Sequence, residues 1–249
     1  MTTNEKFLNA LTSMNKTMKE DIANGHKWAY TNTKKRNASF AAARKAKNYV
    51  TNCASGVDWG LKAAGVPGEA LNWYGGLGKI VWVKGDAKEK CKKYFDIIEI
   101  KGKKTVYQLY NNHELCEGDV LTYMTIQHMN AYVGGKKSFD SGHAYCTGSG
   151  EMAPFKKWIG ALAHGNNKVA YILRLKDRQQ YRVQTGAFTT KTALNKHLKE
   201  LKAKKIAYTT FEEDGMTKVQ VGMYLGKENA EAKVADLKKQ GFGAVVKEV

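Results

Sequence analysis

The residue best placed for chemistry is Cys53, which follows Thr51 and Asn52 at the start of a run with helical character. Thr and Asn are typical N-cap residues, so the pattern predicts a helix that begins at the cysteine. A thiol in the first turn of a helix feels the positive end of the helix dipole, which favours the thiolate. Unpaired backbone N–H groups at the same place can hold an oxyanion. Cys53 is therefore a candidate nucleophile, and the alternative is a small buried apolar residue.

A base and an orienting carboxylate follow Cys53 in the chain. His128 heads a strand-like run, and Asp140 ends the next one, after a turn that contains Gly135. In a hairpin of this length the two side chains can lie next to each other on adjacent strands. The carboxylate would fix the tautomer of the imidazole while the other ring nitrogen reaches a thiol. The remaining histidines considered are expected to be surface or structural residues: His26, His113, His164 and His197.

The other cysteines offer weaker chemistry. The four cysteines form no CxxC pair, which favours a reduced protein. Cys91 lies in a basic stretch and ranks second as a nucleophile, since no His motif accompanies it. The pair His143 and Cys146 is an alternative zinc site that Cys116 or His113 would complete.

The pattern along the chain predicts an α+β fold. Helices are expected first, at Phe7–Met14, Phe40–Val50 and Cys53–Ala64, with another at Ala87–Tyr94. Alternating apolar residues predict strands in between and afterwards. These are Ile80–Val83, Thr105–Tyr110, Asp119–Thr125, His128–Val133, Lys137–Asp140 and Lys168–Leu175. Helices followed by an antiparallel sheet are typical of this class.

A repeat marks the C-terminal part. Tyr181–Phe188 is echoed by Thr217–Tyr224, about 36 residues later. Each copy begins with an alternating strand pattern, continues as an amphipathic helix and closes with a short strand, at Ile206–Phe211 and Gly243–Val246. The repeat therefore predicts a small βαβ–βαβ domain with two helices on one face of a four-stranded antiparallel sheet.

The chain is expected to contain two domains. A polar run suggests a linker at 177–180, with a first domain at 1–176 and a second at 181–249. The net charge of +18 predicts attraction to polyanions such as nucleic acid, anionic lipid or the phosphate polymers of a cell wall. No apolar run is long enough for a spanning helix, so no stable membrane anchor is expected.

The first domain resembles the NlpC/P60 and CHAP-like families of bacterial and phage wall hydrolases, which have a papain-like core. The resemblance rests on a helix-leading Cys, a Gly118-Asp119 turn into a strand, and a His at the start of a Tyr-Val-Gly strand. It implies that Cys53 is the nucleophile, His128 the base and Asp140 the orienting residue. It also implies that aromatic residues upstream, Trp28 and Tyr30, line the cleft, and that the tyrosine hydroxyl assists the oxyanion hole.

The C-terminal repeat resembles a SPOR domain, a ferredoxin-like βαβ–βαβ module of wall proteins that binds glycan strands stripped of their peptides. Tyr181–Phe188 is similar to the opening strand of that family. The resemblance implies a glycan-binding face on the exposed side of the sheet. The residues expected there are Gln184, Phe188, Gln220 and Tyr224.

The two resemblances together predict a peptidoglycan amidohydrolase of the phage or prophage endolysin type. It would cut the muramoyl–L-alanine amide or an amide of the stem peptide, with no metal or other cofactor. Its partner would be peptidoglycan and not nucleic acid, with the stem peptide at the first domain and the glycan strand at the second. Residues 1–14 do not resemble a signal peptide, so we expect synthesis in the host cytoplasm and action on the wall after release.

Two other functions compete with this prediction. One is a basic nucleic-acid-binding protein in which Cys53 is structural, because the net charge is +18 and Gln240–Val246 resembles part of an RNA-recognition motif. The other is a non-enzymatic wall-binding protein.

Overall fold

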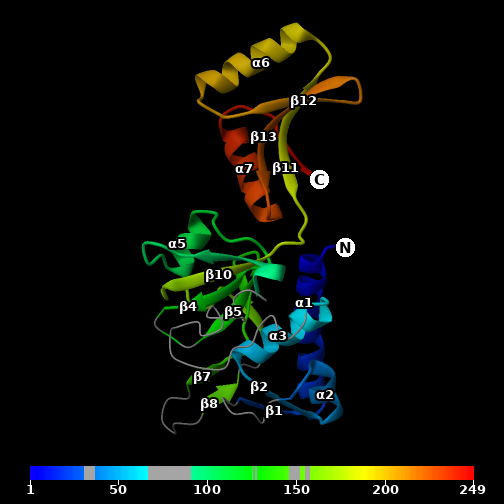
Figure 1. Cartoon of the computed structure of the whole chain (residues 1–249), viewed down its shortest axis with the longest axis vertical. Coiled ribbons are helices and arrows are strands. Elements are labelled where there is room, and N and C mark those ends of the chain that lie inside the picture. Colours follow the sequence, from blue (N-terminus) through cyan, green and yellow to red (C-terminus); the bar gives the residue numbers. More distant parts are fainter. Residues whose placement is uncertain (31–36, 67–90, 125, 127, 146–151, 155–157) are drawn as a thin grey trace. The chain divides into compact units, whose positions relative to one another are not determined.

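The computed structural model describes the chain except for residues 31–36, 67–90, 125, 127, 146–151 and 155–157. It divides into two compact units, Met1–Arg178 and Gln179–Val249 (Figure 1). Within the described residues, no helix is both long and apolar enough to cross a membrane. The strand expected at Ile80–Val83 lies outside the described residues, as does most of the helix expected at Ala87–Tyr94, of which 91–94 are helical.

The first unit combines helices with an antiparallel sheet. Its helices with determined bounds are α1 (Thr3–Ala23), α2 (Phe40–Lys45), α3 (Cys53–Ala63) and α5 (Val106–Asn111). The six strands of its main sheet run in the order β3-β10-β4-β5-β6-β9, and every pairing is antiparallel. They are β3 (Phe95–Glu99), β4 (Val120–Tyr123), β5 (Met129–Gly134), β6 (Lys137–Phe139), β9 (Ile159–Ala161) and β10 (Val169–Leu175).

Four short strands lie outside the main sheet. They form a parallel pair of β1 (Lys27–Tyr30) with β2 (Asn48–Thr51), and an antiparallel pair of β7 (His143–Tyr145) with β8 (Met152–Pro154). The expectation of a helix across Phe40–Val50 is therefore only half correct. The helix ends at Lys45, and Lys47 takes a positive φ of 50° before the chain extends into β2. This strand leads directly into α3, which begins at Cys53.

The strand expected at Thr105–Tyr110 is instead helix α5. The hydroxyl of Thr105 accepts a hydrogen bond from the backbone N–H of Gln108, whose side chain accepts one from the N–H of Thr105. This reciprocal capping box starts a helix even where apolar residues alternate. The strands β3 and β9 were not predicted, because each is short and has mixed polarity.

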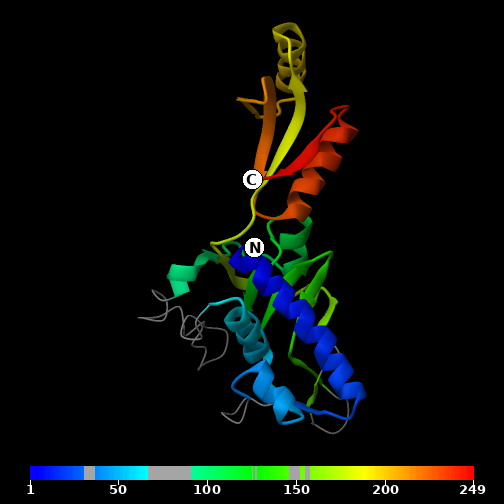
Figure 2. The same cartoon turned by 90° about the vertical axis from the view of Figure 1, so that its right-hand side faces the viewer.

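Helices α1 and α3 pack closely together beside the sheet. Figure 2 shows α1, in dark blue, running alongside α3. Phe7 and Leu11 of α1 are fully buried, and both approach Gly60 of α3, where a side chain would meet the Leu11 methyl at 2.6 Å. Helix α3 also packs against β5. This packing fixes the position of the helix that begins at Cys53.

The second unit is a four-stranded antiparallel sheet with two helices. Its sheet order is β12-β13-β11-β14. The elements are β11 (Tyr181–Phe188), α6 (Lys191–Ala203), β12 (Thr209–Glu213), β13 (Met216–Tyr224), α7 (Lys227–Lys239) and β14 (Val245–Glu248). The βαβ–βαβ order predicted from the repeat is confirmed, with both closing strands shifted by a few residues along the chain.

Candidate active site

Cys53 is the first residue of α3, where the local sequence holds it firmly. Asn52 caps the helix: its side chain accepts the backbone N–H of Ser55 at 2.9 Å, and the Ser55 hydroxyl accepts the N–H of Asn52 at 2.8 Å. The cysteine is a free thiol and 8% exposed. The cap satisfies the N–H of Ser55 and thereby fixes the first turn around the thiol.

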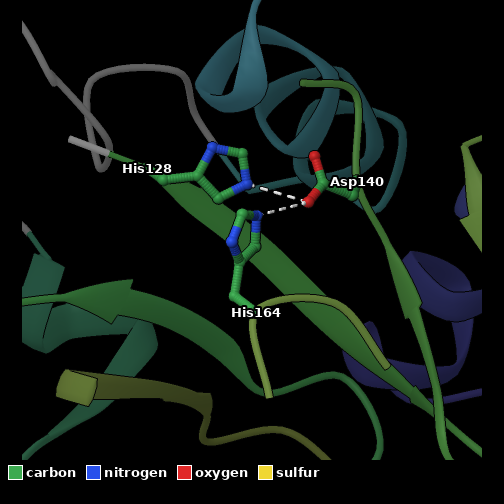
Figure 3. Close-up of side chains that lie close together, drawn as sticks. All are labelled: His128, Asp140 and His164. Atoms are coloured by element: carbon green, nitrogen blue, oxygen red, sulfur yellow. Dashed lines mark hydrogen bonds and ion pairs between the residues drawn. The ribbon is translucent and has the colours of Figure 1, made fainter. Parts of the chain in front are cut away.

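His128 and Asp140 lie at the open end of the β5–β6 hairpin, as its length predicts. Nε2 of His128 lies 2.8 Å from Oδ2 of Asp140 (Figure 3). The other carboxylate oxygen, Oδ1, accepts the backbone N–H of Gly142 at 2.8 Å. Because both carboxylate oxygens are engaged, the orientation of the carboxylate is fixed relative to the imidazole ring.

A serine connects the segment of Asp140 to the start of α3. Ser141 is fully buried, and its hydroxyl donates to the carbonyl of Asn52 at 2.8 Å and lies 3.3 Å from that of Cys53. Gly56, one turn into α3, leaves room for it: a Cβ on Gly56 would lie 2.1 Å from the Ser141 Oγ. The absence of a side chain at Gly56 therefore allows Ser141, the residue after Asp140, to pack against the start of α3.

The electrostatics of the buried pair favour a charged imidazole beside a charged carboxylate. Burial alone would lower the pKa of His128, but the charge and hydrogen bond of Asp140, together with Cys53, raise it to about 10. Burial likewise opposes ionisation of Asp140, yet the two imidazoles and the N–H of Gly142 hold the pKa of this carboxyl well below its usual range. Opposite charges in such close contact stabilise each other.

Cys53 contacts both His128 and Tyr30. Cys53 is among the groups that raise the pKa of His128, through a side-chain hydrogen bond and its charge. Since Nε2 of that ring faces Asp140, Nδ1 is the nitrogen left for the sulfur. The hydroxyl of Tyr30 interacts with the Cys53 side chain and with its backbone N–H. Burial and then the electrostatic interaction with Cys53 raise the pKa of Tyr30 well above its usual range, so its hydroxyl stays a proton donor.

A further polar side chain at the site, His164, was not predicted. Its Nε2 lies 3.3 Å from the same Asp140 Oδ2, and its ring centroid is 4.3 Å from that of His128 (Figure 3). The sequence predicts a surface or structural residue here, and the side chain is 28% exposed. The sequence around it shows only turn-forming residues, Gly165 and two asparagines. The tertiary fold brings it to the site, and no local motif indicates this.

The three side chains also form a set of potential metal ligands. One ligand atom each from His128, Asp140 and His164 lie within 4.8 Å of one another. Two imidazole nitrogens and a carboxylate oxygen suit Zn²⁺. The zinc site considered from the sequence involves Cys146, which lies outside the described residues. Its possible third ligand, Cys116, is buried, and burial raises its pKa to about 11.

The remaining site candidates of the first unit fall into the core. Cys91 is fully buried, and burial raises its pKa to about 12, which disfavours the thiolate. Trp28 packs edge-on against the buried Trp158, with ring centroids 6.0 Å apart, and its Nε1 is a buried donor with no partner among the described residues. Trp28 thus belongs to an aromatic cluster, whereas Tyr30, two residues along β1, reaches the nucleophile.

The sheet of the second unit separates the four residues expected on its open face. Gln184 and Gln220 are register partners across β11 and β13, and their strand neighbours Val183 and Val219 are buried under the helices. Both glutamines therefore belong to the opposite, open face. Gln184 presents little surface there, at 5% exposed, and its amide donates to the carbonyl of Gly186.

Phe188 and Tyr224 do not lie on that open face. Both pack against the core cluster between the sheet and the helices, and the Phe188 ring contacts that of His197 at 4.9 Å. Register shifts beside Gln184 interrupt the simple alternation of β11 and β13. A bulge places two successive residues toward the same side, which a strict two-residue period does not anticipate.

Comparisons with known proteins identify the second unit. The SPOR domain family model matches residues 167–248, beginning just before β10. A similar solved structure is that of the peptidoglycan binding domain of the B. subtilis cell wall lytic enzyme CwlC. The two sequences are 34% identical, over 28% of this chain and 90% of that one, with a TM-score of 0.26. A search of curated proteins finds no match. The C-terminal part of this chain belongs to the SPOR domain family.

Proposed function

We propose that the first unit is a papain-like cysteine amidohydrolase of the NlpC/P60 or CHAP-like kind, and that it cleaves an amide bond of peptidoglycan. The observation that carries this proposal is the contact of Cys53 with His128, whose other ring nitrogen lies 2.8 Å from Asp140. A thiol at a helix start, an imidazole and an orienting carboxylate are the parts that covalent catalysis by cysteine requires. A helix-leading cysteine packed on an antiparallel sheet that carries the histidine is also what the family resemblance implies.

The proposed reaction begins with attack of the Cys53 thiolate on the carbonyl carbon of the amide. The oxyanion that forms is placed near the backbone N–H of Cys53 and the hydroxyl of Tyr30, both of which can donate to it. His128 then gives its Nδ1 proton to the leaving nitrogen, the C–N bond breaks, and a thioester remains. The same nitrogen next removes a proton from water, which attacks the thioester and releases the carboxylic acid and the thiolate.

Asp140 has a supporting role in both halves of this reaction. Its Oδ2 keeps the proton of the neutral imidazole on Nε2, so that Nδ1 has a free lone pair when His128 acts as a base. When His128 is protonated, the adjacent negative charge stabilises the imidazolium.

The second unit is proposed to bind peptidoglycan, as its SPOR family membership suggests. The similar B. subtilis domain is named for peptidoglycan binding. The open face of the sheet is the proposed glycan site, with the Gln220 side chain at its centre. Beside it, the Arg182 guanidinium stacks 4.1 Å from the centroid of the Phe211 ring, and Met223 is 44% exposed. Flat aromatic and guanidinium surfaces of this kind suit the faces of sugar rings.

The combination of the two units suggests an endolysin of phage or prophage origin that acts on the cell wall after release from the host cytoplasm. The net charge of +18 would favour an anionic wall, and this attraction should weaken as salt increases. The bond cut would be the muramoyl–L-alanine amide or an amide within the stem peptide.

The experiment that tests this function uses purified walls and the full chain. Wild type should clear a wall suspension, whereas Cys53→Ala should bind the walls and leave the turbidity unchanged. Cys91→Ala is the matched control, since it removes another buried thiol of the same unit and should still clear the walls. Mass spectrometry of the released fragments then identifies the bond. If Cys53→Ala clears the walls, or if wild type releases no amine and carboxylic acid, cysteine amidohydrolysis is excluded.

A further inference from the structure

We propose that His164 is a positioning residue of the active site, which holds the Asp140 carboxylate in place by a second imidazole hydrogen bond. This inference rests on the proposed cysteine mechanism and adds a further side chain to it. The Asp140 Oδ2 lies 2.8 Å from Nε2 of His128 and 3.3 Å from Nε2 of His164. One oxygen atom thus faces two imidazole nitrogens (Figure 3).

Hydrogen bonds from neighbouring residues hold the backbone turn that carries His164. Its φ of +56° lies in the left-handed region, which residues with side chains seldom occupy. Neighbouring contacts hold the turn: the N–H of Asn167 donates to the His164 carbonyl at 2.8 Å, and that of Tyr107 to the Gly165 carbonyl at 2.9 Å. The N–H of Ala163 donates to the hydroxyl of Ser138 on β6. These contacts hold the turn in which His164 lies 3.3 Å from Asp140.

The hydrogen-bond geometry defines what His164 does. Oδ1 of Asp140 is occupied by the N–H of Gly142, and Oδ2 by the two histidines. For both rings to donate to Oδ2, His164 must carry its proton on Nε2, as His128 does. Donors then hold both oxygens of the carboxylate, Gly142 at Oδ1 and His164 at Oδ2. The carboxylate therefore cannot rotate away when His128 changes its protonation state.

The ionisable groups around this carboxylate come from five parts of the fold. They are Tyr30 on β1, Cys53 on α3, Tyr123 on β4, His128 before β5 and His164 after β9. The hydrogen bond from His164 is one of the contacts that lower the pKa of Asp140. Without it, the carboxylate should take up a proton at a higher pH, and the imidazolium should lose its partner there.

The test compares His164→Gln with His164→Met in the full chain. Both replacements are unbranched and of similar length, and both meet the same backbone strain, but only glutamine can donate to Asp140. The readout is the rate at which iodoacetamide modifies Cys53, followed over pH by mass spectrometry of the Cys53 peptide. We expect His164→Met to react about tenfold more slowly at neutral pH, as for the loss of a hydrogen bond to a charged group. In this variant the acidic limb of the curve of rate against pH should also move to higher pH. The His164→Gln variant should remain close to wild type. Equal profiles for the two variants would overturn the proposal.

A second measurement needs no variant. Long-range ¹H–¹⁵N spectra of the wild-type chain report which ring nitrogen of each histidine is protonated, and we expect Nε2–H at His164. An Nδ1–H tautomer at His164 would exclude the hydrogen bond and with it the proposal. Treatment with EDTA tests the metal alternative: loss of wall clearing that Zn²⁺ restores would make His164 a metal ligand and overturn its positioning role.

These outcomes are separable from those of the proposed function. The thiol reaction and the spectra do not require wall cleavage, so His164 can be shown to position Asp140 even if the walls remain intact. Conversely, wall clearing by wild type with identical profiles for the two His164 variants would retain the amidohydrolase and remove only this inference.

Discussion

Replacement of Gly56 by alanine should damage the active site far more than the stability of the protein. A Cβ at this position would lie 2.1 Å from Oγ and 2.5 Å from Cβ of Ser141, and 3.2 Å from the ring of Phe139. Ser141 directly follows Asp140 and is hydrogen bonded to the start of α3. Relief of the clash must therefore move the segment that carries the catalytic carboxylate.

The expected magnitudes follow from these distances. Non-bonded atoms rest about 3.5 Å apart, so the Ser141 side chain must move by about 1 Å or more. Overpacking of this kind costs about 1–3 kcal/mol, and the gain of about 1 kcal/mol from replacing a helical glycine by alanine offsets part of it. A catalytic group displaced by about 1 Å can cost about 100-fold in rate. Gly56→Ala should therefore remain folded and lose about two orders of magnitude of wall-clearing activity.

The assay is the rate of wall clearing at a temperature where urea denaturation shows the variant to be folded. Gly60→Ala is the matched control, since it makes the same change one turn further along α3. Its Cβ would press on the flexible end of Leu11, 2.6 Å away, and not on the active-site segment. It should lose stability and keep its activity. In Gly56→Ala combined with Ser141→Gly, the clash is removed, and much of the activity lost in Gly56→Ala should return. Wild-type activity in Gly56→Ala, or strictly additive losses in the double variant, would refute the reasoning.

Three further predictions concern the oxyanion donor, the buried ion pair and the wall-binding sheet. Tyr30→Phe should slow amide hydrolysis about 100-fold, as for the loss of one oxyanion donor. It should leave iodoacetamide modification of Cys53 nearly unchanged, because that reaction forms no oxyanion. Similar losses in both reactions would argue against an oxyanion role. The pKa of His128 is raised from 6.5 to about 10, so its contribution to stability is fully present below pH 6.5 and is lost as the pH rises through about 10. Between pH 6 and pH 10, the free energy of unfolding measured with urea should therefore decrease more for wild type than for Asp140→Asn. Equal decreases would contradict the ion pair. In a catalytically inactive full chain, Gln220→Ala should weaken binding to purified glycan strands with little change in melting temperature. Phe188→Ala should instead cost about 2 kcal/mol of stability as a half-buried aromatic, and the opposite pattern would mean that the two faces of the sheet are assigned incorrectly.

The local sequence predicts the structure correctly where a local interaction determines it. The Asn52 cap predicts where α3 begins, and the short turn at Gly135 predicts that His128 and Asp140 meet. The C-terminal repeat predicts the order of helices and strands in the second unit, because each copy contains its own strand and helix pattern. In these cases, residues close in sequence make the contacts that fix the structure.

Features that depend on distant contacts were missed. His164 reaches Asp140 through a left-handed turn after β9, a short strand that pairs with β6 across the sheet. The helix α5 replaces a predicted strand because the capping box of Thr105 outweighs the apolar alternation. The bulges between β11 and β13 place Phe188 and Tyr224 toward the helices. Periodicity alone does not encode where such bulges and turns fall.

The central claim is that the thiol of Cys53 carries out the chemistry. Its most direct measurement is a titration with iodoacetamide, in which the modified fraction of each cysteine is followed by peptide mass spectrometry and wall clearing is followed in the same samples. We predict that Cys53 reacts before the buried Cys91 and Cys116, and that clearing decreases in proportion to the modified fraction of Cys53. Undiminished clearing by a chain whose Cys53 is fully modified would contradict the account.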